Sequence, residues 1–328
     1  MIGAVAATLL REKWLLLAVA LLAVALVLPP IEAMRPVHRY EVTIDISQSM
    51  GTEDVALAGR AASRLALAKA AAAALLRDLP CGSRVGWSVF VEQRTLTLAT
   101  PLEVCEHYDA LLSSLEGIDG RMRWGEASGI GKGLHQSLRA ASEIGDDTAV
   151  VMISDGEEAA PLRAGQSGLP KDEGLGIHGL LAGVGGERPV PIPRFDEEGR
   201  RVGWWQLADV AGNGGIVFRN ARTPGSEPMA PADGGPADGV WPLSGGEVLS
   251  RLDGEHLADL ARLAGLDYAH VARPADLAEA LDAAGLARPA PVAVDLRWIP
   301  AALALLALLW RFRPDRRRLR LRRRAASA

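Results

Sequence analysis

The stretch IDISQSM, residues 44–50, marks the point where a strand ends and a polar loop begins. The residues around its start, Tyr40–Ile46, are rich in β-branched side chains and predict a strand. Alternate residues of an extended segment face the same side, so Asp45, Ser47 and Ser49 present one carboxylate and two hydroxyls together. Open α/β sheets bind ligands at the carboxyl ends of their strands, which makes this point a candidate binding site.

Strands alternate with helices through the rest of the body. Further strands are predicted over 84–91, 95–98, 148–154, 177–184 and 268–271, and helices over 55–79, 106–115, 130–142, 254–264 and 274–284. This alternation predicts a three-layer α/β sandwich with a mainly parallel central sheet and one short antiparallel edge strand, Thr95–Leu98. Residues 220–247 are rich in glycine and proline and predict a long insertion.

The amino-terminal end carries an apolar run from Trp14 to Leu28, followed by Pro29-Pro30. This run is near the shortest length that crosses a bilayer. A cleaved signal peptide is the alternative, because charged residues 11–13 precede the run. Residues 31–33 fit the cleavage pattern poorly, so we predict an uncleaved transmembrane helix over residues 14–33, after a cytoplasmic segment 1–13.

A second apolar run, Trp298–Trp310, is shorter and on its own would also suit a buried core helix. The residues after it, 311–328, carry nine arginines and one aspartate, although the whole chain has a formal net charge of −4. An acidic body joined through an apolar run to an arginine tail follows the positive-inside rule for a cytoplasmic carboxyl terminus. We therefore predict a transmembrane helix over 298–312 and a cytoplasmic tail over 313–328. Nucleic-acid binding by the tail, or a merely solvated charge run, is the alternative.

The chain has two cysteines, Cys81 and Cys105. If the body, residues 34–297, lies outside the cytoplasm, the pair is a candidate disulfide; in the cytosol it would remain two thiols. The sequence holds no CxxC, HExxH or clustered cysteine and histidine set for zinc.

Oxygen donors such as Asp45, Ser47 and Ser49 suit magnesium or calcium rather than zinc. Three oxygens are too few for an octahedral ion, so further donors are expected at neighbouring loops. Asp155 directly follows the apolar strand 148–154, and Ser128 lies in a glycine-flanked loop at the start of a predicted helix. Taken singly, Asp155 is also explained as a turn residue and Ser128 as an ordinary helix cap.

Asp-x-Ser-x-Ser, the later Ser128 loop and the strand-ending Ser-Asp-Gly together resemble the metal-ion-dependent adhesion site (MIDAS) of von Willebrand factor A (VWA) domains. The resemblance spans about residues 38–287. GVGGERPVPIP (183–193) and LDGEHLADLARLAG (252–265) are similar to bacterial membrane-anchored VWA proteins of the aerotolerance (Bat) type. More narrowly, DISQSMGTEDV (45–55), LPCGSRVGWSVF (79–90) and PLEVCEHYDAL (101–111) resemble the MxaL-type VWA protein of methanol-oxidation gene clusters.

The resemblance implies a metal site held by Asp45, Ser47, Ser49, Ser128 and Asp155. The family usually has threonine where this chain has Ser128, which keeps the hydroxyl. The implied cofactor is a divalent cation, Mg²⁺ in the first place, with Ca²⁺ or Mn²⁺ as alternatives. A partner's Asp or Glu carboxylate would complete the coordination.

The implied setting is the bacterial inner membrane, crossed twice, with the VWA domain in the periplasm. There the chain would help to assemble, load or activate an exported enzyme such as methanol dehydrogenase. Other membrane VWA proteins or a MoxR-type AAA+ ATPase are further implied partners, and nucleic acid is not expected as one.

Enzymatic activity is the main alternative interpretation, but the sequence lacks the motifs that would support it. SGIGKGL (128–134) fails the phosphate-loop pattern, GVGGERP (183–189) fails the dinucleotide pattern, and no GxSxG elbow is present. A metal-assisted hydrolase would normally need more carboxylates. We therefore expect a binding protein rather than an enzyme. The remaining alternative is a membrane scaffold whose metal site is degenerate.

Overall fold

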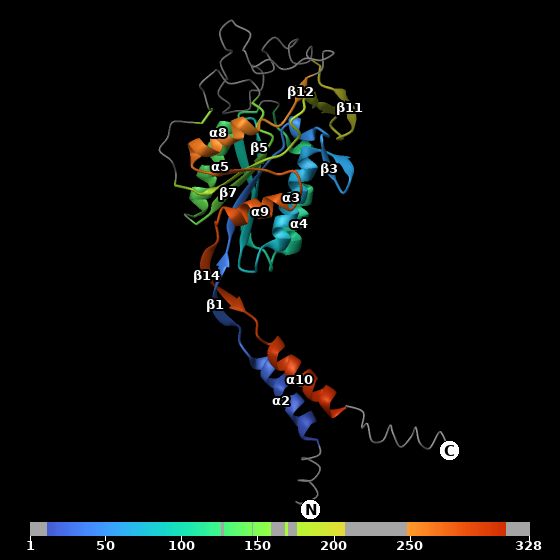
Figure 1. Ribbon diagram of the computed structural model, residues 1–328, viewed down its shortest axis with the longest axis vertical. Helices are drawn as coiled ribbons and strands as arrows, with labels where there is room; N and C mark the ends of the chain where they lie inside the picture. Colours follow the sequence, from blue (N-terminus) through green and yellow to red (C-terminus); the bar gives the residue numbers. More distant parts are fainter. Residues whose placement is uncertain are drawn as a thin grey trace, which may run out of the picture. The chain divides into compact units, whose positions relative to one another are not determined.

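The computed structural model describes residues 12–125, 128–145, 147–158, 168–169, 176–206 and 248–312. Contacts divide the chain into two compact units (Figure 1). The body comprises Pro36–Pro289, and the terminal unit combines the two ends of the chain, up to Arg35 and from Ala290 onward.

A six-stranded sheet, ordered β13-β8-β7-β2-β5-β6, forms the centre of the body. Its strands are β2 (Arg39–Asp45), β5 (Arg84–Val91), β6 (Arg94–Glu103), β7 (Ala149–Ser154), β8 (Gly179–Gly183) and β13 (Asp267–His270). Every neighbouring pair is parallel except β5 and β6, which form an antiparallel hairpin at one edge. The predicted mainly parallel sheet with an antiparallel edge strand is therefore confirmed, although β6 is longer than the predicted 95–98.

Strand β2 is buried on both faces, and its two faces differ in chemistry. Tyr40, Val42 and Ile44 belong to the larger hydrophobic core cluster. Glu41, Thr43 and Asp45 alternate with them and point to the opposite face, where Thr43 donates a hydrogen bond to Ser137 of the covering helix, Ile130–Ile144, at 3.1 Å. The central strand therefore carries a row of polar side chains that leads to the candidate site at its carboxyl end.

Helices cover both faces of the sheet (Figure 1). Helices α3 (Arg64–Asp78), α4 (Tyr108–Gly117) and α9 (Asp276–Ala283) pack on the face that holds Tyr40 and Ile44. Helices α5 (Ile130–Ile144) and α8 (Gly254–Ala264) cover the other face, with Leu134, Leu138, Leu257 and Leu260 in a second core cluster. This arrangement confirms the predicted three layers.

Residues 55–62 differ from the sequence-based expectation. The predicted helix over 55–79 begins only at Arg64, and the preceding residues form a hairpin of β3 (Val55–Leu57) and β4 (Arg60–Ala62). The turn of this hairpin places Ala58 and Gly59 in the left-handed region, at φ 49° and 76°. Ser63 then caps the helix by accepting the Ala66 N–H at 3.1 Å. The alanine-rich composition suggested one long helix, but this turn and this cap separate the two elements.

Short strands lie beside the loop that follows β2. They are β9 (Val190–Pro191), β10 (Pro193–Phe195), β11 (Arg201–Trp204) and β12 (Leu249–Ser250), paired β10 with β11 and β9 with β12. Trp205, just after β11, donates from Nε1 to Gln48 Oε1 at 2.5 Å, and Arg201 pairs with Glu53 at 3.3 Å. The predicted insertion 220–247 lies outside the described residues.

The terminal unit consists of α2 (Lys13–Val27), β1 (Ile31–Val37), β14 (Arg288–Val294) and α10 (Trp298–Arg311). Strand β1 pairs with β14, and the two helices pack through Ala18, Ala304 and Ala307. At one end of the helix pair, Arg311 binds Glu12 at 2.9 Å, and the rings of Trp14 and Trp310 lie 6.0 Å apart.

The two predicted membrane spans are not supported by these elements. The helix predicted over 14–33 ends at Val27, because Pro29-Pro30 cannot continue it, and the next residues form strand β1. Among the helices of the described part of the chain, none combines the length and the apolar character needed to cross a membrane. The predicted tail over 313–328 lies outside the described residues.

Candidate metal centre

Two aspartates lie at the carboxyl ends of adjacent strands. Asp45 is the last residue of β2, and Asp155 directly follows β7. The two strands are parallel, with Ile44 opposite Ile153, so both aspartates reach the same edge of the sheet. Both side chains are fully buried.

Hydrogen bonds fix the carboxylate of Asp45. Its Oδ1 accepts the Ser47 N–H at 2.8 Å, and its Oδ2 accepts the Ser154 hydroxyl at 2.7 Å. The hydroxyl oxygens of Ser47 and Ser49 lie 3.1 Å apart. Ligands about 2.1 Å from an octahedral Mg²⁺ are separated by about 3 Å when they are adjacent, so the spacing of these two hydroxyls suits such an ion.

Ser128 reaches this edge of the sheet through a different loop. It forms an isolated bridge with Glu92, which follows β5, and the Gly129 N–H donates to the Glu92 carbonyl at 2.5 Å. Ser128 is only 4% exposed, and its Oγ has no hydrogen-bond partner among the described residues. A buried hydroxyl without a partner is unfavourable, so this Oγ is available to a ligand.

Asp155 has a positively charged partner that sequence reasoning missed. Arg64 Nη1 donates to Asp155 Oδ2 at 2.7 Å and to Ser250 Oγ at 2.5 Å. The other oxygen of Asp155, Oδ1, accepts the Glu157 N–H at 3.2 Å. The guanidinium of Arg64 also donates hydrogen bonds to Asp54, from Nε to Oδ1 at 3.0 Å and from Nη2 to Oδ2 at 2.7 Å.

Burial and charge shift the pKa values in this cluster. Burial, then the charge of Asp155, raises the pKa of Asp45. Burial, then the same charge, raises the pKa of Glu157. Burial lowers the pKa of Arg64, but the charges of Asp155 and Asp54 outweigh it and raise that pKa. Arg64 therefore stays charged, and an additional cation close to Asp45 would favour the ionised form of that carboxyl group.

The donor set fits a divalent cation. Asp45, Ser47, Ser49, Ser128 and Asp155 offer only oxygen atoms, as Mg²⁺, Ca²⁺ and Mn²⁺ prefer. When ionised, Asp45, Asp54 and Asp155 carry three negative charges and Arg64 one positive charge, which leaves a formal charge of −2. A divalent cation would offset the negative charge of these four groups, beside which lies the further acid Glu157, and the Ser128 hydroxyl can contribute a ligand oxygen to it.

The residues brought together directly are Asp45, Ser47 and Ser49, whereas Ser128 and Asp155 approach the same edge on separate loops. Sequence reasoning missed Arg64, Asp54, Ser154 and Ser250. Ser154 could have been inferred, because it precedes Asp155 on a strand adjacent to Asp45. Arg64 and Ser250 lie far away in sequence from Asp155 and give no local signal.

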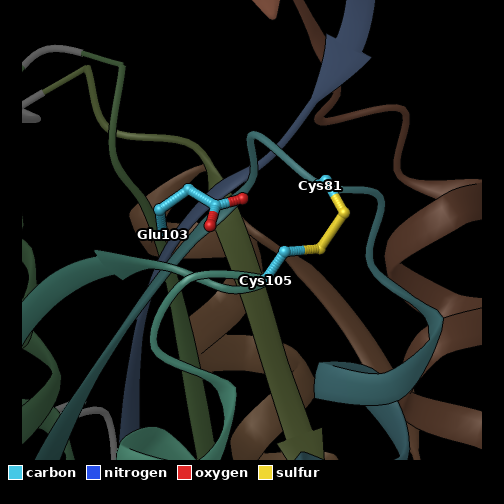
Figure 2. Close-up of side chains that lie close together, drawn as sticks. All are labelled: Cys81, Glu103 and Cys105. Atoms are coloured by element: carbon cyan, nitrogen blue, oxygen red, sulfur yellow. A yellow bond between two sulfur atoms is a disulfide. The ribbon is translucent and has the colours of Figure 1, made fainter. Parts of the chain in front are cut away.

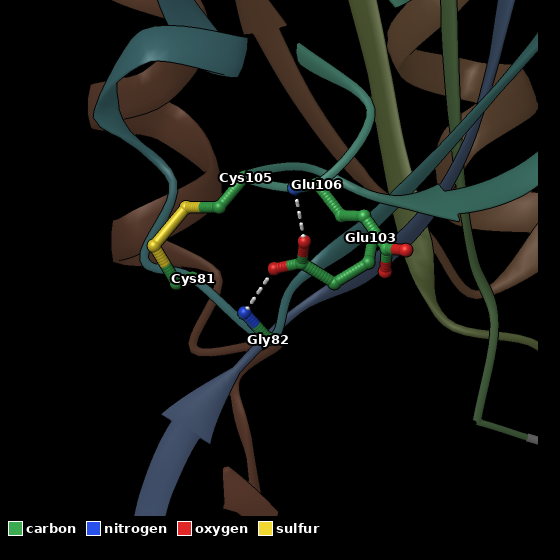
Figure 3. The surroundings of a disulfide bond; sticks show 5 residues. All are labelled: Cys81, Gly82, Glu103, Cys105 and Glu106. Carbon is green, nitrogen blue, oxygen red and sulfur yellow. Dashed lines mark hydrogen bonds between the residues drawn. A yellow bond between two sulfur atoms is a disulfide. The ribbon is translucent and has the colours of Figure 1, made fainter. Parts of the chain in front are cut away.

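A second cluster of potential metal ligands, Cys81, Glu103 and Cys105, is explained by a disulfide (Figure 2). The two cysteines are bonded, with their Cα atoms 5.3 Å apart, so neither sulfur is a free thiolate. The Glu103 carboxylate accepts the N–H groups of Gly82 and Glu106, at 2.5 and 2.6 Å, and so braces the two cysteine loops (Figure 3). This cluster is structural.

Two crystal structures are among the solved structures that are similar to this chain. An aerotolerance-related membrane protein from Bacteroides fragilis shares 19% identity, with a TM-score of 0.45, 76% of this chain covered and 96% of that chain. The conserved hypothetical protein BatB from Bacteroides thetaiotaomicron shares 20% identity, with a TM-score of 0.47 and coverages of 75% and 96%. A comparison with curated proteins finds no match.

The family comparison matches residues 42–158 to the von Willebrand factor type A domain. This segment contains Asp45, Ser47, Ser49, Ser128 and Asp155, the whole candidate centre. It also contains strands β5, β6 and β7 of the central sheet and the carboxyl-terminal end of β2. Residues 42–158 of this chain are therefore part of a von Willebrand factor type A domain.

Proposed function

We propose that this VWA domain binds a divalent cation at Asp45, Ser47, Ser49, Ser128 and Asp155 and uses it to hold the carboxylate of a protein partner. The observation that carries the proposal is the buried Ser128 hydroxyl, which lacks a hydrogen-bond partner among the described residues, at the same sheet edge as two buried aspartates. The cation, Mg²⁺ in the first place, would supply an electrophilic centre for an Asp or Glu side chain.

The proposal is one of binding rather than turnover. Every carboxylate oxygen of Asp45 and Asp155 accepts a hydrogen bond from the chain itself, so both groups are fixed in orientation. Fixed acceptors suit a metal centre, whose ligands keep one orientation. A general base, in contrast, must reach and take a proton from a substrate, whereas Asp155 is held in a buried ion pair with Arg64.

Membrane association is the second part of the proposal, and the packing of the terminal unit supports it. Helices α2 and α10 enclose alanines and leave most of their leucines exposed, an arrangement suited to apolar surroundings. The two-pass inner-membrane topology, the periplasmic location and a role in assembling an exported enzyme such as methanol dehydrogenase rest on sequence resemblance. Capture experiments with candidate partners test that role.

The substitution Asp45→Asn tests the cation site. It removes one negative charge while keeping a side chain of the same shape that still accepts the Ser47 N–H. Titration calorimetry of the full-length protein with Mg²⁺ and Mn²⁺ should show affinity reduced by at least about tenfold, since a carboxylate ligand dominates such sites. Capture of a partner from detergent extracts should fall equally, and EDTA should abolish capture by the wild-type protein.

The matched control is Asp259→Asn, which neutralises an exposed aspartate of helix α8. It should leave both cation affinity and partner capture unchanged. Wild-type affinity in the folded Asp45→Asn protein would refute the proposed centre, and EDTA-resistant capture would refute the metal bridge.

A further inference from the structure

We propose that Arg64 is a built-in competitor for the cation, which weakens the hold of the centre on its ion by sharing Asp155. The inference rests on the proposed function, because it concerns the affinity of that same centre. It assigns Arg64 as a positioning residue: Arg64 acts on the ion through the carboxylate that it holds.

The guanidinium of Arg64 connects the two sides of the centre. Nη1 lies 2.7 Å from Asp155 Oδ2, and Nη2 lies 2.7 Å from Asp54 Oδ2. Nη1 also donates to Ser250, which belongs to β12 and lies outside the matched segment 42–158. The buried guanidinium of Arg64 thus connects the end of β7, the loop after β2 and strand β12.

Arg64 has little room to move away when an ion arrives. Its side chain is completely buried, and its backbone N–H donates to the Thr52 carbonyl at 3.1 Å at the start of α3. Gly185 lies so close that a Cβ atom there would come 2.8 Å from Nε. Asp54, its main partner, is held in turn by the Gly186 N–H at 2.8 Å. The positive charge is therefore a fixed part of the centre.

A fixed positive charge beside a metal ligand has two electrostatic consequences. It reduces the negative potential that attracts a cation, and the effect is strong because burial limits screening. It also occupies Asp155 Oδ2, which leaves Oδ1 as the oxygen that remains for the ion or for a bound water. Asp54 offsets the first effect but lies on the far side of the guanidinium from Asp155.

Weak intrinsic affinity gives the partner's carboxylate a larger role. An ion that is held loosely by the chain gains more from one additional negative ligand, so occupancy of the centre and docking of the partner become coupled. Arg64 would therefore make the centre depend on its partner instead of being permanently filled.

Two variants test this role through Mg²⁺ and Mn²⁺ affinity, measured by calorimetry on the full-length protein. The double variant Asp54→Asn with Arg64→Gln removes one charge of each sign, so the formal charge of the centre stays at −2 while Asp155 is released. It should bind the cation at least about fivefold more tightly than the wild type. Asp54→Asn alone leaves the charge of Arg64 uncompensated and should bind at least about fivefold more weakly.

Thermal denaturation without metal establishes whether each variant is folded. If the double variant is not folded, the cation affinity of Asp54→Asn alone serves as the test. Wild-type affinity in the folded variants, or weaker binding by the double variant, would overturn the inference and leave the proposed function intact. Binding by the double variant alone would support the inference and overturn cation binding by the natural chain. Binding by none of the three proteins would overturn both.

Discussion

Glu41 is a buried carboxyl group with incomplete hydrogen bonding in the middle of the sheet. Its Oε1 pairs with the Ser88 hydroxyl, and its Oε2 has no partner among the described residues. Burial raises the pKa of Glu41 to about 7, and the hydrogen bond from Ser88 only partly opposes that change. The protonated form is therefore the one that suits the fold.

The first prediction concerns Glu41→Gln. The pKa of Glu41 is raised by folding, so its contribution to stability is full below pH 4.5 and is lost as the pH rises to about 7. The wild type should lose about 3 kcal/mol of unfolding free energy over this range through this group. The variant should lack that loss, and urea denaturation at pH 5 and pH 8 measures it.

A matched control for this experiment is Glu143→Gln, an acid that is 74% exposed on helix α5. It should follow the wild-type pH dependence. If Glu41→Gln also follows the wild type between pH 5 and pH 8, Glu41 titrates as an ordinary surface acid and its buried protonated state is refuted.

Single residues could be predicted from sequence where the strand geometry decides their position. Asp45 and Asp155 follow from strand ends, because parallel strands bring their carboxyl ends to one edge. Arg64 could not be predicted, since its partners Asp155 and Ser250 lie 91 and 186 positions away. Its position at the start of an alanine-rich helix is equally typical of an exposed arginine.

Among the elements, the β5–β6 hairpin is the one that carries a covalent restraint. Cys81 precedes β5 and Cys105 follows β6, so the disulfide joins the open end of the hairpin (Figure 3). Strand β5 runs parallel to β2, and its amino-terminal end therefore lies at the sheet edge opposite Asp45. The bond should contribute to stability without touching the metal centre.

The distance between the disulfide and the metal centre predicts that removing the bond affects stability and leaves cation binding unchanged. Replacing both cysteines by serine frees a loop whose ends are 24 residues apart, which should lower the unfolding free energy by about 3 kcal/mol in the chain-entropy model. Urea denaturation measures the loss, and the wild type with a dithiol reductant serves as the comparison. Mg²⁺ affinity should stay at the wild-type value. A changed affinity would contradict the separation of the two ends.

The order of helices and strands was predictable because apolar runs in this chain are separated clearly by glycine and proline residues. The β3–β4 hairpin was not, because Val55–Ala62 has the alanine-rich composition of the helix that follows it. Its turn depends on Ala58 at a left-handed φ of 49°, a conformation that the residue type does not suggest. The apolar terminal runs do form helices, but the prolines end the first one at Val27, and neither described helix has the length and apolar character of the predicted membrane span.

At the scale of the whole molecule, the terminal unit has a packing pattern opposite to that of the body. The body buries leucines and valines together with alanines, whereas the buried residues between α2 and α10 are Ala18, Ala304 and Ala307. Leu16 on α2 and Leu306 on α10 are 48% and 60% exposed. Small residues between helices and large apolar residues outside are typical of helices surrounded by lipid, where close packing replaces the hydrophobic effect.

The final prediction tests lipid as the partner of this surface. The full-length protein should float with phosphatidylcholine vesicles in a density gradient. Leu16→Glu and Leu306→Glu should each reduce the bound fraction by at least about tenfold, because each loses apolar burial and adds a charge that lipid disfavours. Both positions are exposed, so the fold should persist.

Leu263→Glu, at a leucine of α8 that is 55% exposed, is the matched control and should float normally. Equal flotation of all four proteins would show that these leucines do not face lipid.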